Sequence, residues 1–205
     1  MLVLASASPR RQELLRNAGI SFTVQPAGID ETPRPGEQPR DCAERLAREK
    51  ALAVFHRRPH DCILGADTIV VVDDAILGKP RNSDDAVRML RQLSGRKHAV
   101  ITGVCVVEAV ASQGEELATG NRPLATAFER TSSDTTLVTM SDLSDDEIRD
   151  YVATGEPMDK AGAYAIQGIA SRWIPRIEGD YSNVVGLPVA LVYAMLRKNA
   201  RALSR

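Results

Sequence analysis

The chain has 205 residues and a mass of 22.2 kDa, which is long enough to bury one large hydrophobic core or two small ones. Its composition is 43% hydrophobic and 26% charged, which argues against a disordered, collagen-like or low-complexity protein. A formal net charge of −1 and an aromatic content of 4% argue against a protein that binds duplex or single-stranded nucleic acid.

The hydrophobic periodicity predicts strands and helices that follow one another along the chain. In the first half of the chain we expect a strand at residues 2–5, a helix at 9–18, a strand at 22–25, a helix at 41–57, and a strand at 62–72 that turns through a hairpin at 73–74. After these we expect a helix from 83 to about 93, strands at 99–110 and 135–140, and a helix from 145 to about 153. Short strands at 162–167 and 173–177 and a helix after Pro188 complete the predicted order. Ser8, Ser83 and Ser144 are the expected N-caps. Residues 112–133 are expected to form a mobile polar insertion in a single domain over 1–205. This order predicts an α/β or α+β fold around one twisted mixed sheet flanked by helices.

Membrane and secretory segments are not expected in this chain. Apolar runs such as residues 69–72 are too short to span a bilayer, and residues 1–7 lack the basic start of a signal peptide. Cys42, Cys62 and Cys105 are odd in number and form no C-x-x-C pair. We therefore expect reduced thiols in a cytoplasmic protein, and neither a disulfide framework nor a zinc site.

Two arginines occupy the first turn of the first helix, in the run Ser6-Ala7-Ser8-Pro9-Arg10-Arg11. A helix N-terminus carries partial positive charge and free N–H groups, so acidic residues are preferred there. Hydroxyl groups, free N–H groups and two guanidinium groups at the end of a strand together suit the binding of a polyanion. The alternative interpretation is two exposed arginines on a surface helix.

Two charged residues interrupt apolar patterns in the next elements. Lys50 falls within the apolar stripe of the helix at 41–57, where it must extend to solvent, pair with a carboxylate or point into a ligand cavity. Asp67 interrupts the apolar strand at 62–72, and Gly65 beside it allows a close approach of ligand or backbone. Asp67 is either a structural carboxylate bonded to the backbone, or a metal ligand or general base for a water nucleophile.

Further charges lie in predicted loops, where ordinary surface positions are the alternative. Lys79 follows the hairpin in Gly78-Lys79-Pro80, and Asp30 and Glu31 follow a turn. Taken together, a strand carboxylate, a loop glutamate, four cations and a helix N-terminus suit magnesium-assisted chemistry on a phosphate chain. Such catalysis depends mainly on positioning and charge neutralisation.

Several other mechanisms lack their motifs. The sequences G-x-x-x-x-G-K-[ST], G-x-G-x-x-G, G-x-S-x-G and H-E-x-x-H are absent. His56 and His60 are four residues apart, but Pro59 breaks the helix that a metal-binding pair would need, so we expect surface histidines. The acidic run at 145–147 is explained by helix capping.

Five ordered segments, which together cover nearly the whole chain, form a recognisable set of motifs: Ser6-Ala7-Ser8-Pro9-Arg10-Arg11-Gln12-Glu13-Leu14-Leu15, Arg48-Glu49-Lys50-Ala51, Gly65-Ala66-Asp67-Thr68, Gly78-Lys79-Pro80-Arg81, and Asp159-Lys160-Ala161-Gly162-Ala163-Tyr164 with Ile166-Gln167-Gly168 and Val185-Gly186-Leu187-Pro188. In these segments the chain resembles the Maf family of nucleotide pyrophosphatases. The resemblance implies a Maf/Ham1-like α/β fold with a deep cleft between two lobes, usually as a homodimer. The chain departs from the family pattern in the insertion at 112–133.

The resemblance also implies an activity: hydrolysis of a nucleoside triphosphate to the monophosphate and pyrophosphate, with Mg²⁺ or Mn²⁺. In that reaction Asp67 would be the catalytic acid/base or the metal-activating carboxylate, and Glu31 would assist with the metal. The phosphates would be bound by Ser6, Arg10, Arg11, Lys50 and Lys79. We expect in-line attack of a metal-activated water on the α-phosphorus.

Substrate choice is associated in the family with the positions of Arg10, Thr68 and Gln167. Lys-Ala-Gly-Ala-Tyr followed by Ile-Gln-Gly resembles the subgroup that acts on dTTP and UTP, and Gln167 offers both a donor and an acceptor to the imide edge of thymine or uracil. Modified pyrimidine nucleotides are further candidate substrates. Two other interpretations are a nucleotide-binding regulator of cell division or septum formation, and a Ham1-like pyrophosphatase for purine nucleotides such as ITP or XTP.

Overall fold

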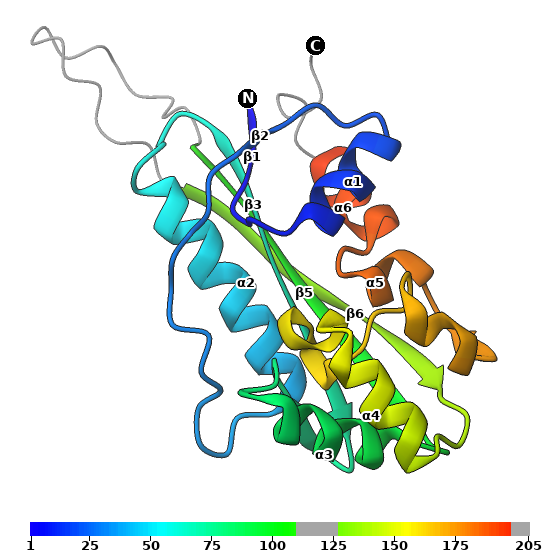
Figure 1. Cartoon of the computed structure of the whole chain (residues 1–205). Coiled ribbons are helices and arrows are strands. Elements are labelled where there is room, and N and C mark those ends of the chain that lie inside the picture. The colour runs from blue at the N-terminus through cyan, green and yellow to red at the C-terminus, as the bar shows by residue number, and fades with distance from the viewer. Residues whose placement is uncertain (110–126, 198–205) are drawn as a thin grey trace, which may run out of the picture.

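The computed structural model describes residues 1–109 and 127–197, and within them seven strands form one sheet (Figure 1). The strands are β1 (Leu2–Leu4), β2 (Thr23–Val24), β3 (Cys62–Val72), β4 (Ala75–Leu77), β5 (Lys97–Ala109), β6 (Ala127–Thr139) and β7 (Arg176–Glu178). Their order is β2-β1-β3-β5-β6-β7, with β4 also on β3. β1 runs parallel to β2 and β3, and the other pairs are antiparallel. The predicted mixed sheet is therefore confirmed.

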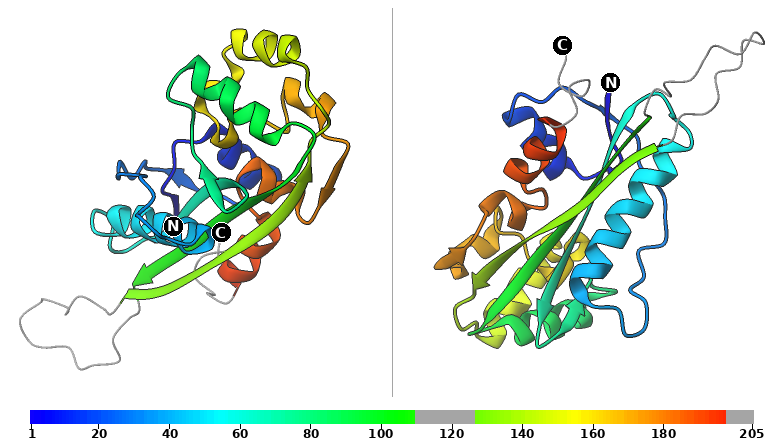
Figure 2. Two further views of the ribbon diagram at one scale, coloured as in Figure 1. Left: turned by 90° about the horizontal axis from the view of Figure 1, so that it is seen from below. Right: turned by 180° about the vertical axis from the view of Figure 1, so that it is seen from behind.

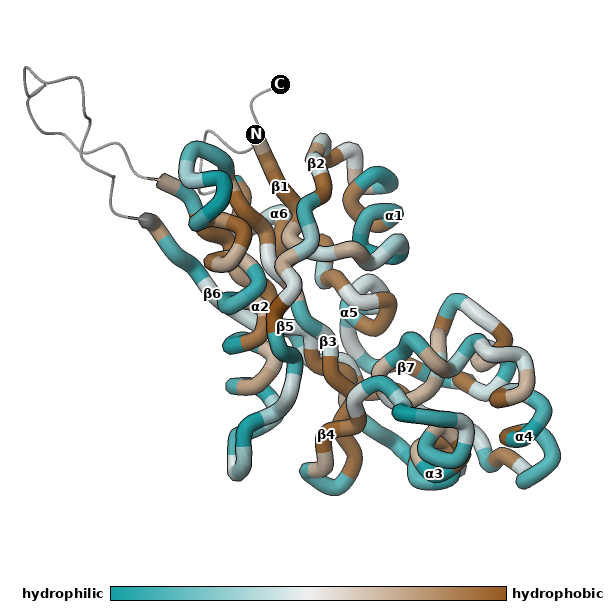
Figure 3. Tube along the Cα trace, turned by 60° about the vertical axis from the view of Figure 1, so that its left-hand side comes forward, coloured by the Kyte–Doolittle hydropathy of each residue, from teal (hydrophilic) through white to brown (hydrophobic). Residues whose placement is uncertain are grey.

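Helices cover both faces of this sheet. They are α1 (Pro9–Asn17), α2 (Pro39–Phe55), α3 (Ser83–Leu93), α4 (Asp145–Ala153), α5 (Tyr181–Val185) and α6 (Val189–Arg197), with the 3₁₀ turns η1 (Glu156–Asp159), η2 (Ala161–Ala163) and η3 (Ile169–Trp173). Figure 2 shows α2 on one side of the sheet and α1, α5 and α6 on the other. In Figure 3, β1 and β4 are hydrophobic, whereas much of α3 is hydrophilic because it covers the outside of the molecule.

The short β1 strand and its neighbour β3 alternate their side chains between these two layers. Leu2, Leu4 and Leu64 pack with residues of α1 and α6, whereas Val3 and Ile63 pack with residues of α2. A period of two is what a strand with both faces covered requires, and it explains the nearly continuous apolar sequence of both strands.

Two threonines divide the face that carries α1 and α6 into two hydrophobic cores. Thr68 of β3 lies opposite Thr102 of β5. On one side of this pair, Ala66 and its neighbours pack with α1 and α6. On the other side, Val70 and its neighbours pack with α3 and α4. The polar pair thus marks the boundary between two lobes.

The edge of β3 is interrupted at the same level. β1 pairs with residues 62–64 and β4 with residues 70–72, both on the edge opposite β5. Among the described residues, no strand pairs with 65–69 on that edge. This gap leaves the middle of β3 accessible from the side.

Two glycines bring α2 directly against the sheet. A Cβ atom on Gly65 would lie 2.1 Å from the carbonyl oxygen of Ala47, and one on Gly103 would lie 2.2 Å from that of Ala43. Because the obstructing atoms belong to the helix backbone, a side chain at either glycine would force α2 away from the strands. This contact fixes the distance of Lys50, on α2, from β3.

Helix caps largely follow the sequence, with one correction. The Ser8 side chain accepts a hydrogen bond from the backbone N–H of Arg11, and Ser144 forms the predicted capping box with Glu147. The cap of α3 is Asn82 and not Ser83, because the Asn82 side chain accepts from the backbone of the third helical residue. Asparagine and serine are about equally good caps, so their adjacency left the choice open.

Other differences concern the insertion and the region after α4. Residues 127–133 were expected in a loop but belong to β6, where they pair with residues 103–109 of β5; the rest of the 112–133 insertion lies outside the described residues. No strand forms at 162–167, because Gly162 and Ala163 have φ angles of 69° and 59° within the turn η2. The strand expected at 173–177 is β7, which begins at residue 176.

The cysteines and the paired histidines agree with the sequence interpretation. Cys42, Cys62 and Cys105 are free and buried, and burial raises their pKa values to about 11, 12 and 11. His56 and His60 are exposed. None of the described helices has the length and apolar character needed to cross a membrane.

Candidate active site

A cavity of about 610 Å³ opens at the gap in the edge of β3, between the two lobes. Its lining comes from the turn after β1, the middle of β3, the loop after β4, two residues of α2 near its centre (Leu46 and Lys50), and the segments 159–167 and 184–186. All nine sequence-predicted site residues line it: Ser6, Arg10, Arg11, Glu31, Lys50, Asp67, Thr68, Lys79 and Gln167. Segments far apart in the sequence therefore meet at one place, as the predicted cleft requires.

Arg11 is a buried anchor at the N-terminus of α1. Its Nε donates to the carbonyl of Gly186 at 2.8 Å, Nη1 to Ser6 Oγ at 3.1 Å and Nη2 to Thr68 Oγ1 at 3.0 Å. Burial lowers the pKa of its guanidinium group, although the nearby carboxylates of Asp67 and Glu31 oppose that effect. A guanidinium group has five N–H donors, so Arg11 holds three segments together and retains two donors.

The second arginine of the pair has a different environment. Arg10 is partly exposed, and its Nη1 lies 3.8 Å from Oδ2 of Asp159, which comes from η1 in the other lobe. The two side chains both line the cavity. The interpretation of both arginines as exposed surface residues is therefore wrong for Arg11, and Arg10 is placed where a bound anion would compete with Asp159.

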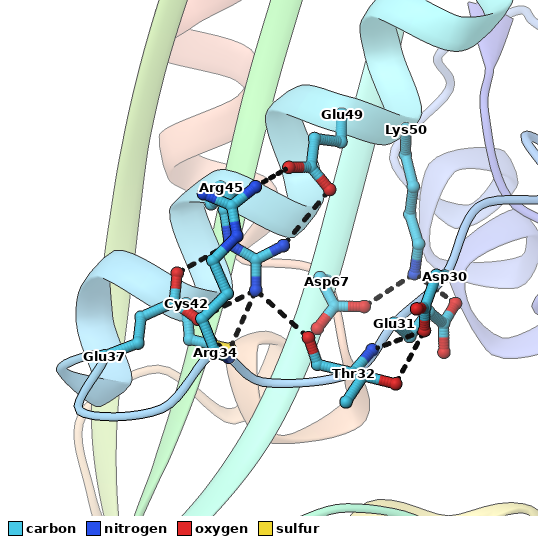
Figure 4. A network of polar contacts seen from close by, with 10 residues as sticks. All are labelled: Asp30, Glu31, Thr32, Arg34, Glu37, Cys42, Arg45, Glu49, Lys50 and Asp67. Carbon is cyan, nitrogen blue, oxygen red and sulfur yellow. Dashed lines mark hydrogen bonds and ion pairs between the residues drawn. The ribbon is translucent and has the colours of Figure 1, made fainter.

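Lys50 is the centre of the charged cluster. It is 7% exposed, and its Nζ donates to Oδ1 of Asp67 at 2.6 Å and lies 2.6 Å from Oε1 of Glu31 (Figure 4). Extension to solvent, the simplest interpretation of Lys50 alone, is therefore wrong. A buried charge costs several kcal/mol unless it is paired, so the two carboxylates are what make this lysine tolerable.

Asp67 is equally enclosed, at 6% exposure. Its Oδ1 accepts from Lys50, while Oδ2 has no hydrogen-bond donor among the described residues. The interpretation of Asp67 as a carboxylate satisfied by the backbone is therefore not what the structure shows. One oxygen is held in place and the other remains available as an acceptor.

Glu31 connects Lys50 and Lys79, two of the three lysines that line the cavity. Besides Lys50, it accepts a hydrogen bond from Nζ of Lys79 at 3.2 Å. Partial burial raises the pKa of Glu31, but the hydrogen bond and charge of Lys50, followed by the charge of Lys79, outweigh this and lower it below the ordinary value. Glu31 is therefore a carboxylate at neutral pH and balances both lysines.

A divalent cation fits this donor set only in company with substrate. Within residues 1–109 and 127–197, no group of three or more His, Cys, Asp or Glu side chains could hold a metal ion. Glu31 and Asp67 supply two carboxylates, and Mg²⁺ typically binds through one or two carboxylates together with phosphate oxygens and water. The chain offers two carboxylates and leaves the rest of the coordination shell to phosphate oxygens and water.

Thr68 belongs to a row of hydroxyl groups across the sheet. The hydroxyl of Thr102 donates to the backbone carbonyl of Asn183 at 3.1 Å, so at the 3.0 Å contact between the two threonines Thr68 is the donor. The other acceptor within reach of Thr68 is the carbonyl of Gly186 at 3.3 Å. In either case its single proton is used within the protein, and Thr68 can only accept a hydrogen bond from a ligand.

A residue that the sequence analysis missed holds the loop that carries Glu31. Arg45 of α2 donates from Nε to Oε1 of Glu37 at 2.5 Å and from Nη2 to Oε2 at 2.8 Å (Figure 4). It also donates to the backbone carbonyl of Thr32 at 3.3 Å and to Glu49 at 3.1 Å. A bidentate arginine–carboxylate pair of this kind forms some of the stronger hydrogen bonds found in proteins.

Replacing Arg45 with alanine is expected to destabilise the protein by about 2 kcal/mol at neutral pH, because ionic hydrogen bonds are lost. The Arg45 bond lowers the pKa of Glu37 from 4.5 to about 2, so its stabilisation is present above pH 4.5 and is lost as the pH falls toward 2. Urea unfolding at pH 7 and near pH 3 should therefore show a smaller difference between the two proteins at the lower pH. Arg40→Ala, at an exposed position of the same helix, is the control. An effect of Arg45→Ala that is equal at both pH values would contradict this account.

Comparison with known proteins relates the chain to a family. Residues 1–199 match the family described as Maf-like protein. A dTTP/UTP pyrophosphatase of Koribacter versatilis is 52% identical over 197 residues, which is 96% of this chain and 93% of that protein. Proteins of the same name from Syntrophomonas wolfei and Geobacter sulfurreducens are 48% and 51% identical, with 98% and 96% of this chain and 99% and 95% of those proteins covered.

A solved structure is also similar over its length. The nucleoside-triphosphatase / dITP/XTP pyrophosphatase of Mycobacterium abscessus aligns with 100% of this chain and 99% of its own, at 14% identity and a TM-score of 0.42.

Proposed function

This chain belongs to the Maf family, and from that premise we propose that it hydrolyses dTTP and UTP to the monophosphate and pyrophosphate. The observation that carries the proposal is the buried Lys50, which contacts both Asp67 and Glu31 in a cavity lined by Arg10, Arg11 and Lys79. The relatives, which are 48% to 52% identical to this chain over nearly its full length, are named for the same reaction and substrates, and this supports the proposal.

Asp67 is proposed as the acceptor of the proton from the attacking water. Lys50 fixes its Oδ1, and Oδ2 is left to receive that proton. The water oxygen forms a bond to the α-phosphorus while the bond between that phosphorus and the bridging oxygen breaks, so the β- and γ-phosphates leave together as pyrophosphate. When bound by Glu31 and Asp67, a divalent cation, Mg²⁺ or Mn²⁺, supplies neutralisation of the phosphate charge.

The cations bind the phosphate chain by exchanging partners. Lys50 and Lys79 are paired with Glu31 in the free protein, and Arg10 lies near Asp159. A triphosphate brings several negative charges to these groups and stabilises the charge that develops on the departing pyrophosphate. Ser6, whose hydroxyl accepts from Arg11 and from the backbone N–H of Ser8, shapes the turn beneath the phosphates.

The base is proposed to bind beside Gln167 and Thr68. The amide of Gln167 can donate to one carbonyl oxygen of uracil or thymine and accept from its N–H, and Thr68 offers only an acceptor. Arg10 is the third position that the family associates with substrate choice. Outside the site, the family resemblance leads us to expect a homodimer, which sedimentation velocity would test.

The proposal predicts the products of a nucleotide panel. Purified protein with Mg²⁺ is incubated with dTTP, UTP, CTP, ATP, GTP and ITP, and monophosphate, diphosphate and pyrophosphate are separated. We expect monophosphate and pyrophosphate from dTTP and UTP and little from the purine nucleotides.

Each other outcome has a defined meaning. Release of diphosphate and free phosphate would show that water removes the terminal phosphate and does not attack the α-phosphorus. Turnover of ITP that is faster than that of dTTP and UTP would indicate a purine pyrophosphatase. Binding without turnover of any nucleotide would indicate a nucleotide-binding regulator.

A further inference from the structure

The segment that carries Gln167 is held from behind by two side chains. The backbone N–H of Ala165 donates to the hydroxyl of Tyr151 at 3.3 Å, and the backbone N–H of Ile169 donates to Glu156, 3.1 Å from Oε1 and 3.2 Å from Oε2. The Tyr151 hydroxyl in turn donates to Oε1 of Glu156 at 2.8 Å. The backbone is therefore fixed two residues before and two residues after Gln167, at a single connected pair.

This support packs against the hydrophobic core and lies outside the cavity. Tyr151 is 1% exposed, and its ring packs edge to face against Trp173 with 5.4 Å between the ring centroids. Neither Tyr151 nor Glu156 is among the residues of the described chain that line the cavity. The Tyr151 hydroxyl and the Glu156 carboxylate can therefore act on a ligand only through the segment that they hold.

Gly168 shows how closely the segment rests on this support. A Cβ atom at Gly168 would lie 2.1 Å from Oε1 of Glu156. A side chain at residue 168 would displace this carboxylate, which is the end of a flexible side chain, so the backbone of Gly168 lies directly against Glu156. The contact therefore helps to set the depth of the neighbouring Gln167, which is how far Gln167 reaches into the cavity.

Depth matters because the hydrogen bonds of Gln167 do not by themselves separate all bases. Uracil presents an N–H donor beside a carbonyl acceptor, and the six-membered ring of hypoxanthine presents the same pair. A glutamine amide can satisfy either base. Hypoxanthine is larger by one fused ring, so what separates the two is the space between Gln167 and the groups that hold the phosphates.

We propose that Tyr151 and Glu156 are positioning residues that set the depth of Gln167 and thereby favour a pyrimidine over a purine with the same hydrogen-bonding edge. This inference rests on the proposed function and deepens it. Without the support, the segment 165–169 moves back, a uracil base loses contact with Gln167, and the larger base gains room.

The experiment measures kcat and KM for UTP and ITP in Glu156→Ala and Tyr151→Phe. For each we expect the ratio of kcat/KM for UTP to that for ITP to fall about tenfold, mainly because KM for UTP rises, with kcat for UTP changed little. In Glu156→Gln, the amide oxygen can accept from both Tyr151 and Ile169, so most of the ratio should be restored. Asp150→Ala, an exposed acidic position on the same helix as Tyr151, is the control and should match the wild type.

The two substitutions act on one support, so their effects on the ratio should not add. The double variant should resemble the more affected single variant, as a double-mutant cycle would show. Thermal unfolding and the emission of Trp173, the sole tryptophan, check that each variant is folded. Tyr151→Phe keeps the ring packing, so it remains informative if Glu156→Ala fails to fold.

The failure of the inference differs from the failure of the proposed function. If UTP and ITP turnover fall by the same factor in folded variants, Tyr151 and Glu156 are merely structural and the inference is overturned. If the wild type releases no pyrophosphate from any nucleotide, the proposed function fails first.

Discussion

Replacing Asp67 with asparagine is expected to reduce kcat for UTP by roughly a thousandfold while the protein remains folded. Asparagine has nearly the same shape and can still accept a hydrogen bond from Lys50, but its amide cannot take a proton from water at neutral pH. Lys50 also keeps Glu31 at 2.6 Å, so its charge stays compensated and the fold is not left with an isolated buried cation. Pyrophosphate release measures the activity, and circular dichroism with thermal unfolding checks the fold.

The matched control for this substitution is Asp74→Asn. Asp74 lies in the turn between β3 and β4 with a φ of 63°, a conformation that asparagine tolerates well. The charge change is the same but occurs away from the cavity lining, so activity should be unchanged. A folded Asp67→Asn protein with near-normal turnover would show that another group takes the proton.

Replacing Gly65 with alanine is expected to destabilise the protein by about 3 kcal/mol or more, at the upper end of the range for an added methyl group in a packed interior. The new Cβ would lie 2.1 Å from the carbonyl oxygen of Ala47 and 2.8 Å from the backbone nitrogen of Ala51, and neither atom can rotate away. Relief requires α2 to move outward, which would carry Lys50 away from Asp67. Urea unfolding measures the stability, and UTP hydrolysis reports the displacement of Lys50.

Gly78→Ala is the comparison for this variant. A Cβ at Gly78 meets no atom within 4 Å, so the same chemical change should cost little stability there. A free energy of unfolding for Gly65→Ala within about 1 kcal/mol of the wild-type value would be below the usual cost of overpacking. It would show that α2 does not pack against β3 as tightly as the distances indicate.

The sequence reveals the functional residues because they conflict with their surroundings. Lys50 within an apolar helix stripe and Asp67 within an apolar strand each have a structural cost that a function can explain. What a periodicity cannot show is that these two residues lie 2.6 Å apart, because that distance depends on how α2 crosses β3 at Gly65. The candidate residues were thus predictable, and their pairing was not.

Segments whose conformation depends on contacts with residues far away in the sequence were harder to predict. The turn η2 is held by a hydrogen bond from the backbone N–H of Gly162 to the carbonyl of Gly78 at 3.1 Å, and the segment after it by Glu156. Neither partner is visible in a local pattern, so β-rich composition suggested a strand at 162–167. The polar start of β6 was assigned to a loop for the same reason: Ser132 and Ser133 gain their strand pairing from β5. Arg45 was missed because an arginine on a polar helix face has no local signal.

The three buried cysteines have a practical consequence for labelling. Thiolates, and not thiols, react with alkylating reagents, and the raised pKa values keep Cys42, Cys62 and Cys105 protonated and enclosed at neutral pH. A single cysteine introduced at Ile169, whose side chain is 38% exposed while its backbone N–H binds Glu156, can therefore carry a fluorescent or spin label without removal of the native thiols. Such a label would sit at the end of the segment 165–169 that holds Gln167 and would record the displacement of that segment directly in the otherwise unaltered protein.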